Sequence, residues 1–259
     1  MYAIIGDIGN TVTKVCSIDT KTFKIKKIIY FNSNKTYSTK FLKKIFKKIV
    51  NKNLFIKSAL FSSVVPKNEI FIRKFLKKNY NINFKEIKEQ SIRKIVKINI
   101  KNKKQVGSDR IANAVGVYKK YKNNCIVLDF GTATTFDVIR KNGTYDGGVI
   151  SPGVNLSIKS LAKFADQIPI FSLTKPKKII GKNTKEALRA GFFWGYVGLI
   201  NSIISKIEKE TKLKYRIIFT GGYADLFKTS IIRPFKIDKN ITICGIIEIF
   251  KNNIKNLIK

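Results

Sequence analysis

Histidine is absent from this chain and acidic residues are scarce. Of 259 residues none is His, and 16 are Asp or Glu against 52 Lys and Arg. The lack of His excludes Ser-His-Asp and Cys-His catalysis, His-ligated zinc and phosphohistidine chemistry. A general base must therefore be a carboxylate, Lys, Tyr or Cys.

Cysteine is also rare. Cys16, Cys125 and Cys244 are far apart, and no two of them form a C-x-x-C pair. Each lies in an apolar run, so we expect buried, reduced thiols and a reducing compartment. The N-terminal sequence has no basic region before Asp7, and the longest uncharged stretch, 190–205, is shorter than a bilayer span. We expect a soluble, cytoplasmic protein with no membrane partner.

The cationic excess gives a formal net charge of +36. One explanation is an anionic partner, such as nucleic acid, an anionic membrane or a phosphorylated substrate. The other is codon composition, because the excess is mostly Lys and many Ile and Asn residues accompany it. We favour the second explanation, since the lysines are spread along most of the chain.

The hydrophobic pattern indicates a globular α/β protein, and 44% of the residues are hydrophobic. Alternating or buried apolar runs predict strands at 2–8, 11–18, 23–31, 54–65, 125–129, 134–139, 145–150 and 216–220. Helical spacing predicts helices at 41–50, 67–79, 108–121, 155–164, 183–209 and 245–258. The Lys-rich segment 85–106 is weakly patterned, and we expect a strand and a long connection there.

One pattern occurs twice. A strand, the residues D-x-G, a turn and two further strands appear at 7–11 and again at 129–133. Repetition half a chain apart predicts an internal duplication. We place the boundary near residue 120, with an N-terminal domain of 1–120 and a C-terminal domain of 121–259. No linker rich in Pro or Ser marks the boundary, which favours two domains packed closely around a cleft.

Asp7 and Asp129 each end a buried strand and are followed by a glycine turn. A buried carboxylate is costly unless it is paired, hydrogen-bonded or bound to a cation. Glycine lets backbone N–H groups approach an anion closely, and the threonines that follow add donors. The aspartate would hold a metal ion or water beside the phosphate. Two such loops facing each other would bind a triphosphate from both sides.

Gly107-Ser108-Asp109-Arg110 begins a predicted helix, and two interpretations stay open. Either Ser108 or Asp109 caps the helix and Arg110 is a surface charge, or Asp109 is a base beside a cation that binds a carboxylate or phosphate. The glycine-rich segments 147–153 and 220–222 are either tight turns or points of close approach to a ligand.

Together these motifs resemble the type III pantothenate kinases, a family of the actin-like ATPase superfold. The matching segments cover nearly the whole chain in the family's order: DIGNTVTK (7–14), FSSVVP (61–66), GSDR (107–110), DFGTATT (129–135), GGVISPG (147–153), NTKEALRAG (183–191) and TGG (220–222). The chain departs from the family at Ser108, where Ala is usual, and in the weakly matched segment 85–106, which leaves one wall of the expected pantothenate pocket undefined.

The resemblance implies two duplicated ribonuclease-H-like (actin-like ATPase) α/β domains with ATP in the cleft between them, and a homodimer. It implies transfer of the ATP γ-phosphoryl group to the pantothenate hydroxyl, giving 4′-phosphopantothenate, the first step toward coenzyme A. Mg²⁺ and a monovalent cation, K⁺ or NH₄⁺, are the implied cofactors.

The resemblance also assigns roles to residues. Asp109 resembles the general base. Asp129 resembles the K⁺ ligand, and Asp7 would bind Mg²⁺ directly or through water. ATP contacts are implied for Asp7, Ile8, Gly9, Asn10, Thr11, Val12, Thr13, Lys14 and Thr132. Pantothenate contacts are implied for Gly107, Ser108, Asp109, Arg110 and Thr184.

Two other functions compete with this one. Another small-molecule kinase or phosphohydrolase of the superfold would fit the D-x-G loops equally, but GSDR and NTKEALRAG argue against it. An accessory transcription regulator or other nucleic-acid-binding relative would fit the charge. Because no helix-turn-helix, zinc-finger or RNA-recognition signature is visible, we expect only weak, sequence-indifferent binding to nucleic acid.

Overall fold

The computed structural model describes residues 1–50 and 55–258, and it divides the chain into two compact units. The first unit comprises Met1–Lys122, Gly143–Tyr145 and Asn240–Lys259. The second comprises Asn123–Asn142 and Asp146–Lys239. The final helix of the chain therefore lies with the N-terminal unit. The predicted domains 1–120 and 121–259 are continuous stretches of sequence, and they stay a prediction.

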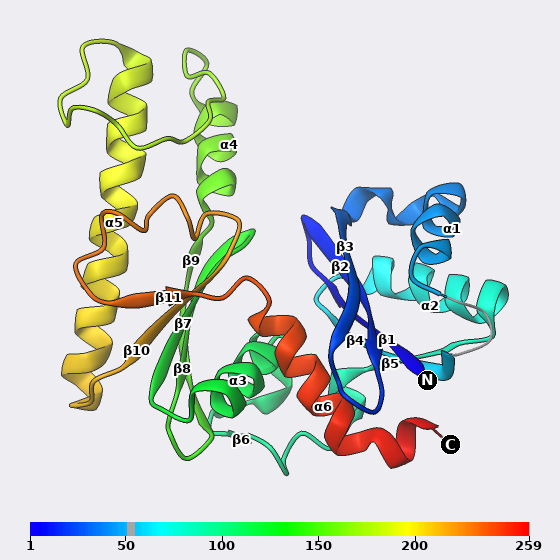
Figure 1. The fold of residues 1–259 in the computed structure, drawn as a ribbon. Coiled ribbons are helices and arrows are strands. Elements are labelled where there is room, and N and C mark those ends of the chain that lie inside the picture. Colours follow the sequence, from blue (N-terminus) through cyan, green and yellow to red (C-terminus); the bar gives the residue numbers. More distant parts are fainter. Residues whose placement is uncertain (51–54, 259) are drawn as a thin grey trace. The chain divides into compact units, whose positions relative to one another are not determined.

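The first unit is built on a mixed sheet with the strand order β3-β2-β1-β4-β5 (Figure 1). β1 (Tyr2–Ile8), β2 (Val12–Asp19) and β3 (Ile25–Asn32) form an antiparallel meander, as the sequence predicts. β4 (Phe55–Ser63) then returns parallel to β1, and β5 (Asn83–Glu86) runs parallel to β4. The predicted strand 54–65 is confirmed from residue 55; residue 54 lies outside the described residues.

Helices cover both faces of this sheet (Figure 1). One face carries α1 (Thr39–Lys47) and α2 (Pro66–Tyr80), whose apolar residues pack with those of the strands. Ser38 caps α1 by accepting from Phe41 N, and α2 begins at a proline, which has no N–H to leave unpaired. The other face carries α3 (Ser108–Tyr121) and α6 (Ile241–Ile258).

Glycines bring α3 and α6 into backbone contact. A methyl group on Gly245 would lie 1.8 Å from Ala112 O, and one on Gly116 would lie 2.4 Å from Ile241 O. Beside this crossing, Thr242 Oγ1 donates to Asn113 Oδ1 at 2.8 Å. α6 begins four residues before the predicted start at 245, so that Gly245 lies inside the helix and at the crossing.

The segment before α3 is mostly irregular, as its weak pattern predicts. It contains short helical turns at Ile87–Glu89 and Lys103–Gln105 and a short strand, β6 (Lys97–Ile98). β6 pairs with Thr144 and Tyr145 of β9 (Thr144–Pro152). The segment therefore lies against the sheet and is not a free linker.

The second unit contains β7 (Cys125–Phe130), β8 (Ala133–Ile139), most of β9, β10 (Arg216–Gly221) and β11 (Phe235–Ile237). The order of this sheet is β11-β10-β7-β8-β9-β6. In both units the second strand runs antiparallel to the first, and the fourth and fifth run parallel to it. Such a recurrence is what an internal duplication would produce.

Two further helices, α4 (Val154–Phe164) and α5 (Thr184–Thr211), pack with this sheet around one apolar core. Asn183 caps α5 by accepting from Glu186 N at 3.0 Å, and Glu186 Oε2 accepts from Lys182 N at 2.9 Å. In the part of the chain that the structure describes, α5 alone is long and apolar enough to span a membrane, by length and composition. A core helix passes the same test, so this is weak evidence for a span.

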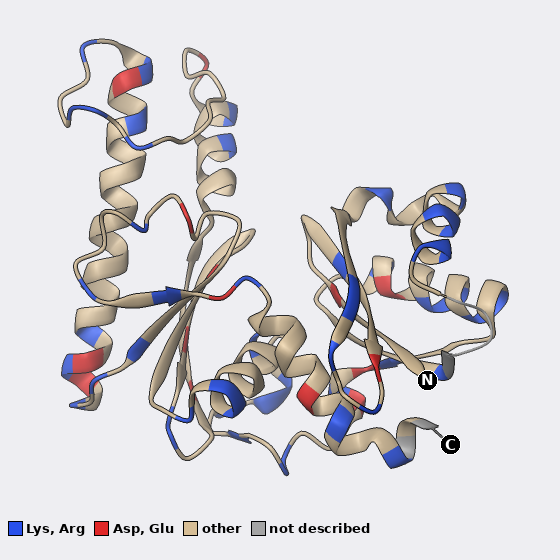
Figure 2. Cartoon of the chain, viewed as in Figure 1, with Lys and Arg blue, Asp and Glu red and all other residues tan. Residues whose placement is uncertain are grey.

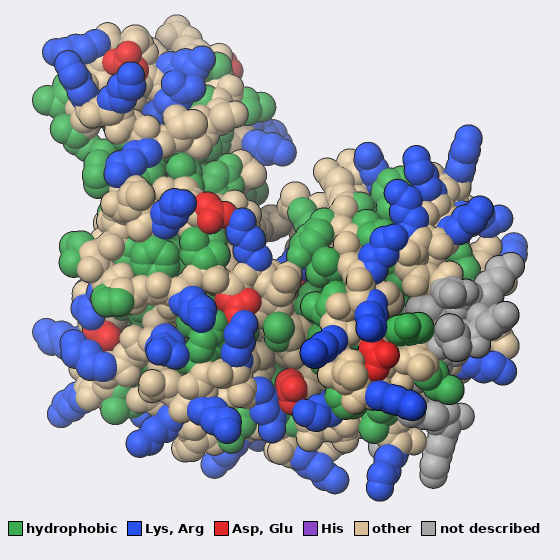
Figure 3. Space-filling model, viewed as in Figure 1, with side chains coloured by type: hydrophobic (Ala, Val, Ile, Leu, Met, Phe, Trp, Pro, Cys, Tyr) green, Lys and Arg blue, Asp and Glu red, His purple; other side chains and the backbone are tan. Residues whose placement is uncertain are grey.

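Lys and Arg occur along helices, strands and loops of both units (Figure 2), and they are scattered over the face seen in Figure 3. All three cysteines are free; Cys16 and Cys125 are buried, as predicted, whereas Cys244 is half-buried. Burial raises the pKa of Cys16 and of Cys125 to about 12, which keeps both thiols protonated at neutral pH.

Candidate active site

The first glycine loop joins β1 to β2, and Ser33 binds it through hydrogen bonds. Gly9 N donates to Val12 O at 3.2 Å, which closes the turn. Ser33 Oγ donates to Gly9 O at 2.6 Å, and Ser33 N donates to Thr11 O at 2.9 Å. Asn10, Thr11 and Val12 are exposed. The tip of the loop is thus exposed to solvent, while hydrogen bonds from Ser33 hold the carbonyl groups of Gly9 and Thr11.

The residues that flank this loop are either buried or charged. Ile8 is buried, and Thr13 is fully buried with its hydroxyl 2.9 Å from Ser33 Oγ. Asp7 is 8% exposed, and its Oδ2 lies 3.9 Å from Lys14 Nζ. This separation makes a long ion pair.

The start of α3 lies beside this loop in the same unit. Val64 links the two: its N–H donates to Ile8 O at 3.1 Å, and its Cγ1 would lie 3.7 Å from a methyl group on Gly107. Asp109 is half-buried in the first turn, where its Oδ1 accepts from Arg110 N at 2.8 Å. The Arg110 guanidinium carbon lies 5.9 Å from the centre of the Tyr145 ring.

The second glycine loop joins β7 to β8. Gly131 N donates to Ala133 O at 3.0 Å, and Gly131 and Thr132 are exposed. Asp129, at the end of β7, is half-buried and pairs in register with Thr135. The predicted turn between two strands is confirmed here.

Two glycine motifs that lie far away in the sequence meet at this second loop. Gly153 N donates to Thr132 O at 3.0 Å, and a methyl group on Gly153 would lie 2.2 Å from that oxygen. Gly221 adopts a positive φ of 85°, and a methyl group there would lie 2.7 Å from Asp129 Oδ1. Gly222 N donates to Phe130 O at 3.0 Å. The segments GGVISPG and TGG therefore shape the loop that carries Asp129 and Thr132.

Thr184, the remaining predicted substrate contact, is exposed at the first position of α5. It lies on the rim of a shallow groove of about 920 Å³ in the second unit. The groove is lined by α4 and α5, including Ser157, Gly191, Gly195 and Tyr196. Tyr196 OH donates to Pro152 O at 2.9 Å, which ties α5 to the end of β9.

The carboxylates suit metal binding only together with other ligands. Among residues 1–50 and 55–258, no group of three or more His, Cys, Asp or Glu could hold a metal ion. Mg²⁺ is usually bound by one or two carboxylates together with waters and substrate phosphates, so a single carboxylate such as that of Asp7 fits this role. Asp129 offers a half-buried carboxylate, the oxygen ligand that hard cations accept.

Sequence reasoning missed Ser33, whose hydroxyl donates to Gly9 O from 24 residues away in the sequence. Ser33 belongs to no glycine motif, and only the pairing of β2 with β3 brings it to the loop. Val64 lies in the segment FSSVVP (61–66) that carries the resemblance, but no pattern in the sequence indicates its role as a link.

Solved structures place the fold in a known class. A Baf family transcriptional activator from Campylobacter jejuni aligns with a TM-score of 0.59 and 21% identity over 97% of this chain and 99% of its own. An activator of 2-hydroxyisocaproyl-CoA dehydratase from Clostridium difficile, solved with bound ADPNP, aligns with a TM-score of 0.57 and 11% identity over 99% and 97%. The fold is therefore the α/β fold of actin-like ATPases and sugar kinases.

Sequence relatives define the family. The model of the type III pantothenate kinase family matches residues 3–206. A type III pantothenate kinase from Pelagibacter ubique is 49% identical over 94% of this chain and 96% of its own length, and one from Jannaschia sp. is 38% identical over 76% of each. The chain belongs to the type III pantothenate kinase family, a family of ATP-dependent kinases.

Proposed function

We propose that this chain phosphorylates pantothenate, transferring the γ-phosphoryl group of ATP to its hydroxyl group and releasing ADP and 4′-phosphopantothenate. The observation that carries the proposal is the placement of Asp109 in the first turn of α3, joined through Val64 to the glycine loop of β1 and β2. A carboxylate beside a phosphate-binding loop is the arrangement that a kinase acting on an alcohol requires.

In this proposal Asp109 accepts the hydroxyl proton as the alcohol oxygen attacks the γ-phosphorus and the bond to the β–γ bridging oxygen breaks. Arg110 binds the pantothenate carboxylate, and Gly107, Ser108 and Thr184 line the same substrate. Phosphoryl transfer depends mainly on positioning and charge stabilisation, which backbone N–H groups supply without reorganising.

ATP binding is assigned to residues 7–14 and to Thr132. The support for this assignment is the exposed tip at Asn10, Thr11 and Val12, and the exposed Thr132 hydroxyl on a loop fixed by Gly153. Asp7 would hold Mg²⁺, directly or through water, and Asp129 would hold K⁺ or NH₄⁺. When bound, these ions neutralise the negative charge of the phosphates.

We further infer a cytoplasmic homodimer that forms through α4 and α5. Phe164 is 79% exposed and Trp194 is 37% exposed. A methyl group on Gly191 or Gly195 would meet no atom within 4 Å, so the surface of α5 is open to a close neighbour. Sedimentation of the wild type and of Gly195→Arg tests this inference: the wild type should be a dimer and the variant a monomer.

One assay tests the reaction. The purified chain is incubated with ATP, Mg²⁺ and pantothenate, once in K⁺ and once in Na⁺, and the product is identified by its mass. We expect 4′-phosphopantothenate in K⁺ and little in Na⁺. If a folded protein that binds ATP gives no product in either salt, the phosphoryl acceptor is a different compound or the chain is a regulator.

A further inference from the structure

Four buried polar side chains form a hydrogen-bonded cluster beside the glycine loop of β1 and β2: Thr13, Ser33, Thr36 and Asn68. Thr13 Oγ1 lies 2.9 Å from Ser33 Oγ. Asn68 Nδ2 donates to Ser33 O at 3.0 Å and to Thr36 Oγ1 at 3.4 Å. Burying polar side chains costs free energy that apolar residues of the same shape would not cost. The cluster therefore needs an explanation beyond packing.

Ser33 sets the direction of two peptide groups in the loop. Its hydroxyl donates to Gly9 O at 2.6 Å, and its N–H donates to Thr11 O at 2.9 Å. The described peptide bonds are all trans, and in a planar trans peptide the C=O and the following N–H point in opposite directions. The N–H groups of Asn10 and Val12 therefore point away from Ser33. Backbone N–H groups directed to one side of an exposed loop are the donors that a phosphate group needs.

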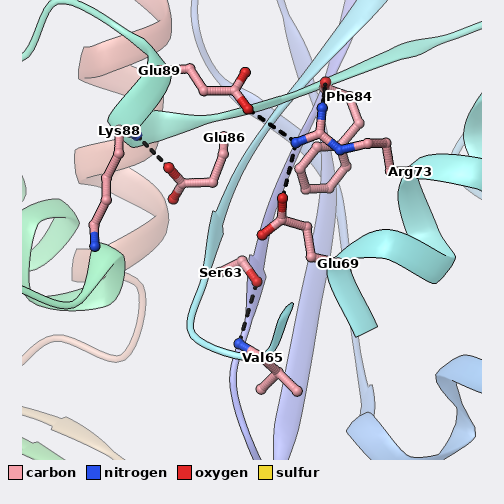
Figure 4. Close-up of polar contacts among 8 residues, drawn as sticks. All are labelled: Ser63, Val65, Glu69, Arg73, Phe84, Glu86, Lys88 and Glu89. Carbon is pink, nitrogen blue, oxygen red and sulfur yellow. Dashed lines mark hydrogen bonds and ion pairs between the residues drawn. The ribbon is translucent and has the colours of Figure 1, made fainter. Parts of the chain in front are cut away.

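Asn68 belongs to the first turn of α2, and this helix is held against the sheet. Val65 N donates to Ser63 Oγ at 3.4 Å where β4 turns into α2 (Figure 4). Further along the helix, Arg73 donates to Phe84 O of β5 at 2.9 Å, and the same guanidinium binds two carboxylates (Figure 4). The Asn68 amide is thus a donor on a fixed helix, one hydrogen bond away from Ser33.

We propose that Asn68 is a positioning residue for ATP: it holds Ser33, and through Ser33 it orients the loop N–H groups that bind the phosphates. This inference rests on the proposed function, in which residues 7–14 bind ATP. Asn68 itself is not among the residues to which the family resemblance assigns a contact with ATP or pantothenate.

The expected effect is on the binding of ATP. Without the amide of Asn68, Ser33 O and the Thr36 hydroxyl lose a buried donor, and the short helical turn Ser33–Tyr37 relaxes. The loop N–H groups then meet the phosphates in poorer geometry, which weakens hydrogen bonds to a charged group. A rise of about tenfold in the KM for ATP corresponds to weakening one such bond.

Pantothenate should not be affected in the same way. Its implied contacts in the first unit are in the segment 107–110, at the start of α3. Among the described residues, the Asn68 side chain donates to Ser33 and Thr36 and not to this segment. A purely structural asparagine would lower stability and leave both KM values unchanged, so the two KM values distinguish a positioning role from a structural one.

Four variants test this in the pantothenate assay. Asn68→Asp keeps the size but replaces the donating NH₂ group by an oxygen, and Asn68→Ala removes the amide altogether. Ser33→Ala removes the hydroxyl that donates to Gly9 O, and the double variant Asn68→Ala/Ser33→Ala removes both. Asn79→Ala is the matched control, because Asn79 is a half-buried asparagine of the same helix whose Nδ2 donates to Phe75 O at 2.9 Å.

We expect Asn68→Asp, Asn68→Ala and Ser33→Ala each to raise the KM for ATP by about tenfold, with the KM for pantothenate unchanged. The double variant should show less than the product of the single effects, because Asn68 acts through Ser33. Asn79→Ala should keep both KM values. A wild-type KM for ATP in the Asn68 variants, an equal rise in both KM values, or effects that multiply in the double variant would overturn the inference.

A second measurement separates this inference from the proposed function. Calorimetry with ATP and Mg²⁺ reports the loop without any turnover. Weaker ATP binding in Asn68→Asp, but not in Asn79→Ala, supports the inference even if the wild type proves inactive toward pantothenate. Unchanged affinity in both Asn68 variants contradicts it, as does a wild type that binds no ATP. If neither Asn68 variant folds, Thr36→Val decides, because it removes one acceptor of the amide at similar size; unchanged ATP affinity in that variant contradicts the inference.

Discussion

Gly107 leaves the space that the Asp109 carboxylate fills: a methyl group on Gly107 would lie 2.5 Å from Asp109 Oδ1. The φ of Gly107 is −60°, so an alanine fits the backbone there and only the carboxylate must move. We predict that Gly107→Ala folds normally and lowers kcat by about tenfold, because the base is displaced. Kinetics and thermal unfolding check this together.

The control for this prediction is the double variant Gly107→Ala/Asp109→Asn. If the alanine acts through the carboxylate, it should cost almost nothing once the base has been removed. A tenfold loss that persists in the Asp109→Asn background would show that Gly107 acts in another way, for example through its own contact with substrate.

Asp109→Asn should remove most of the phosphoryl transfer while the fold and ATP binding remain. The asparagine keeps the size of the side chain and can still accept a hydrogen bond from Arg110 N, but it cannot take the hydroxyl proton. A general base contributes about 10²–10⁴ in rate, so we expect a fall in kcat within that range. ATP affinity, measured by calorimetry, should be unchanged. Full activity in this variant would remove Asp109 from the role of base.

Asp129→Ala should abolish the difference between K⁺ and Na⁺. The side chain at 129 lies against Gly221, where a methyl group would be 2.7 Å from its Oδ1, so the truncation removes a ligand without crowding the loop. Activity in K⁺ should fall to the level that the wild type shows in Na⁺. A variant that still responds to K⁺ would place the cation elsewhere.

Much of the fold could be predicted from local patterns, because local chemistry decides those elements. The meander of β1 to β3 follows from alternation and the turn at Gly9, and the turn between β8 and β9 follows from Asn142 and Gly143, which has a φ of 82°. The place of α6 could not be predicted in this way. Its packing on α3 depends on Gly116 and Gly245, which are 129 residues apart, and nothing near either glycine indicates the other.

Some residues of the candidate site could likewise be predicted from the sequence, and others could not. The residues in glycine motifs could be proposed from sequence, because a strand that ends in Asp and Gly has few alternative uses. Ser33 lies in no such motif, and it reaches Gly9 only because β3 returns beside β2. Its burial depends on the tertiary structure, which no spacing in the sequence indicates.

Gly245→Ala should destabilise the first unit. The added methyl group would lie 1.8 Å from Ala112 O and 3.0 Å from Gly116 N, and backbone atoms cannot rotate away. Overpacking of this kind costs about 1–3 kcal/mol, which exceeds the gain of about 1 kcal/mol from replacing a helical glycine. Gly198→Ala in α5 is the control, because a methyl group there meets nothing within 4 Å. Urea unfolding should show a loss for Gly245→Ala and no loss for Gly198→Ala.

Because Glu86 is buried, the stability of the wild type should fall as the pH rises through the range in which this carboxyl group ionises. Burial, the largest cause, and the Glu69 charge raise the pKa of Glu86 above its ordinary value of 4.5, although the bond from Lys88 N opposes this. A raised pKa means that the folded protein favours the protonated form.

As pH rises above 4.5 toward the folded pKa, the wild type should lose stability relative to Glu86→Gln, which does not titrate at this site. The steepest slope for one group is about 1.4 kcal/mol per pH unit, and the difference should level off above the folded pKa. Urea unfolding of the wild type and of Glu86→Gln between pH 4 and 8 measures this difference, and a difference that does not vary with pH would contradict the raised pKa.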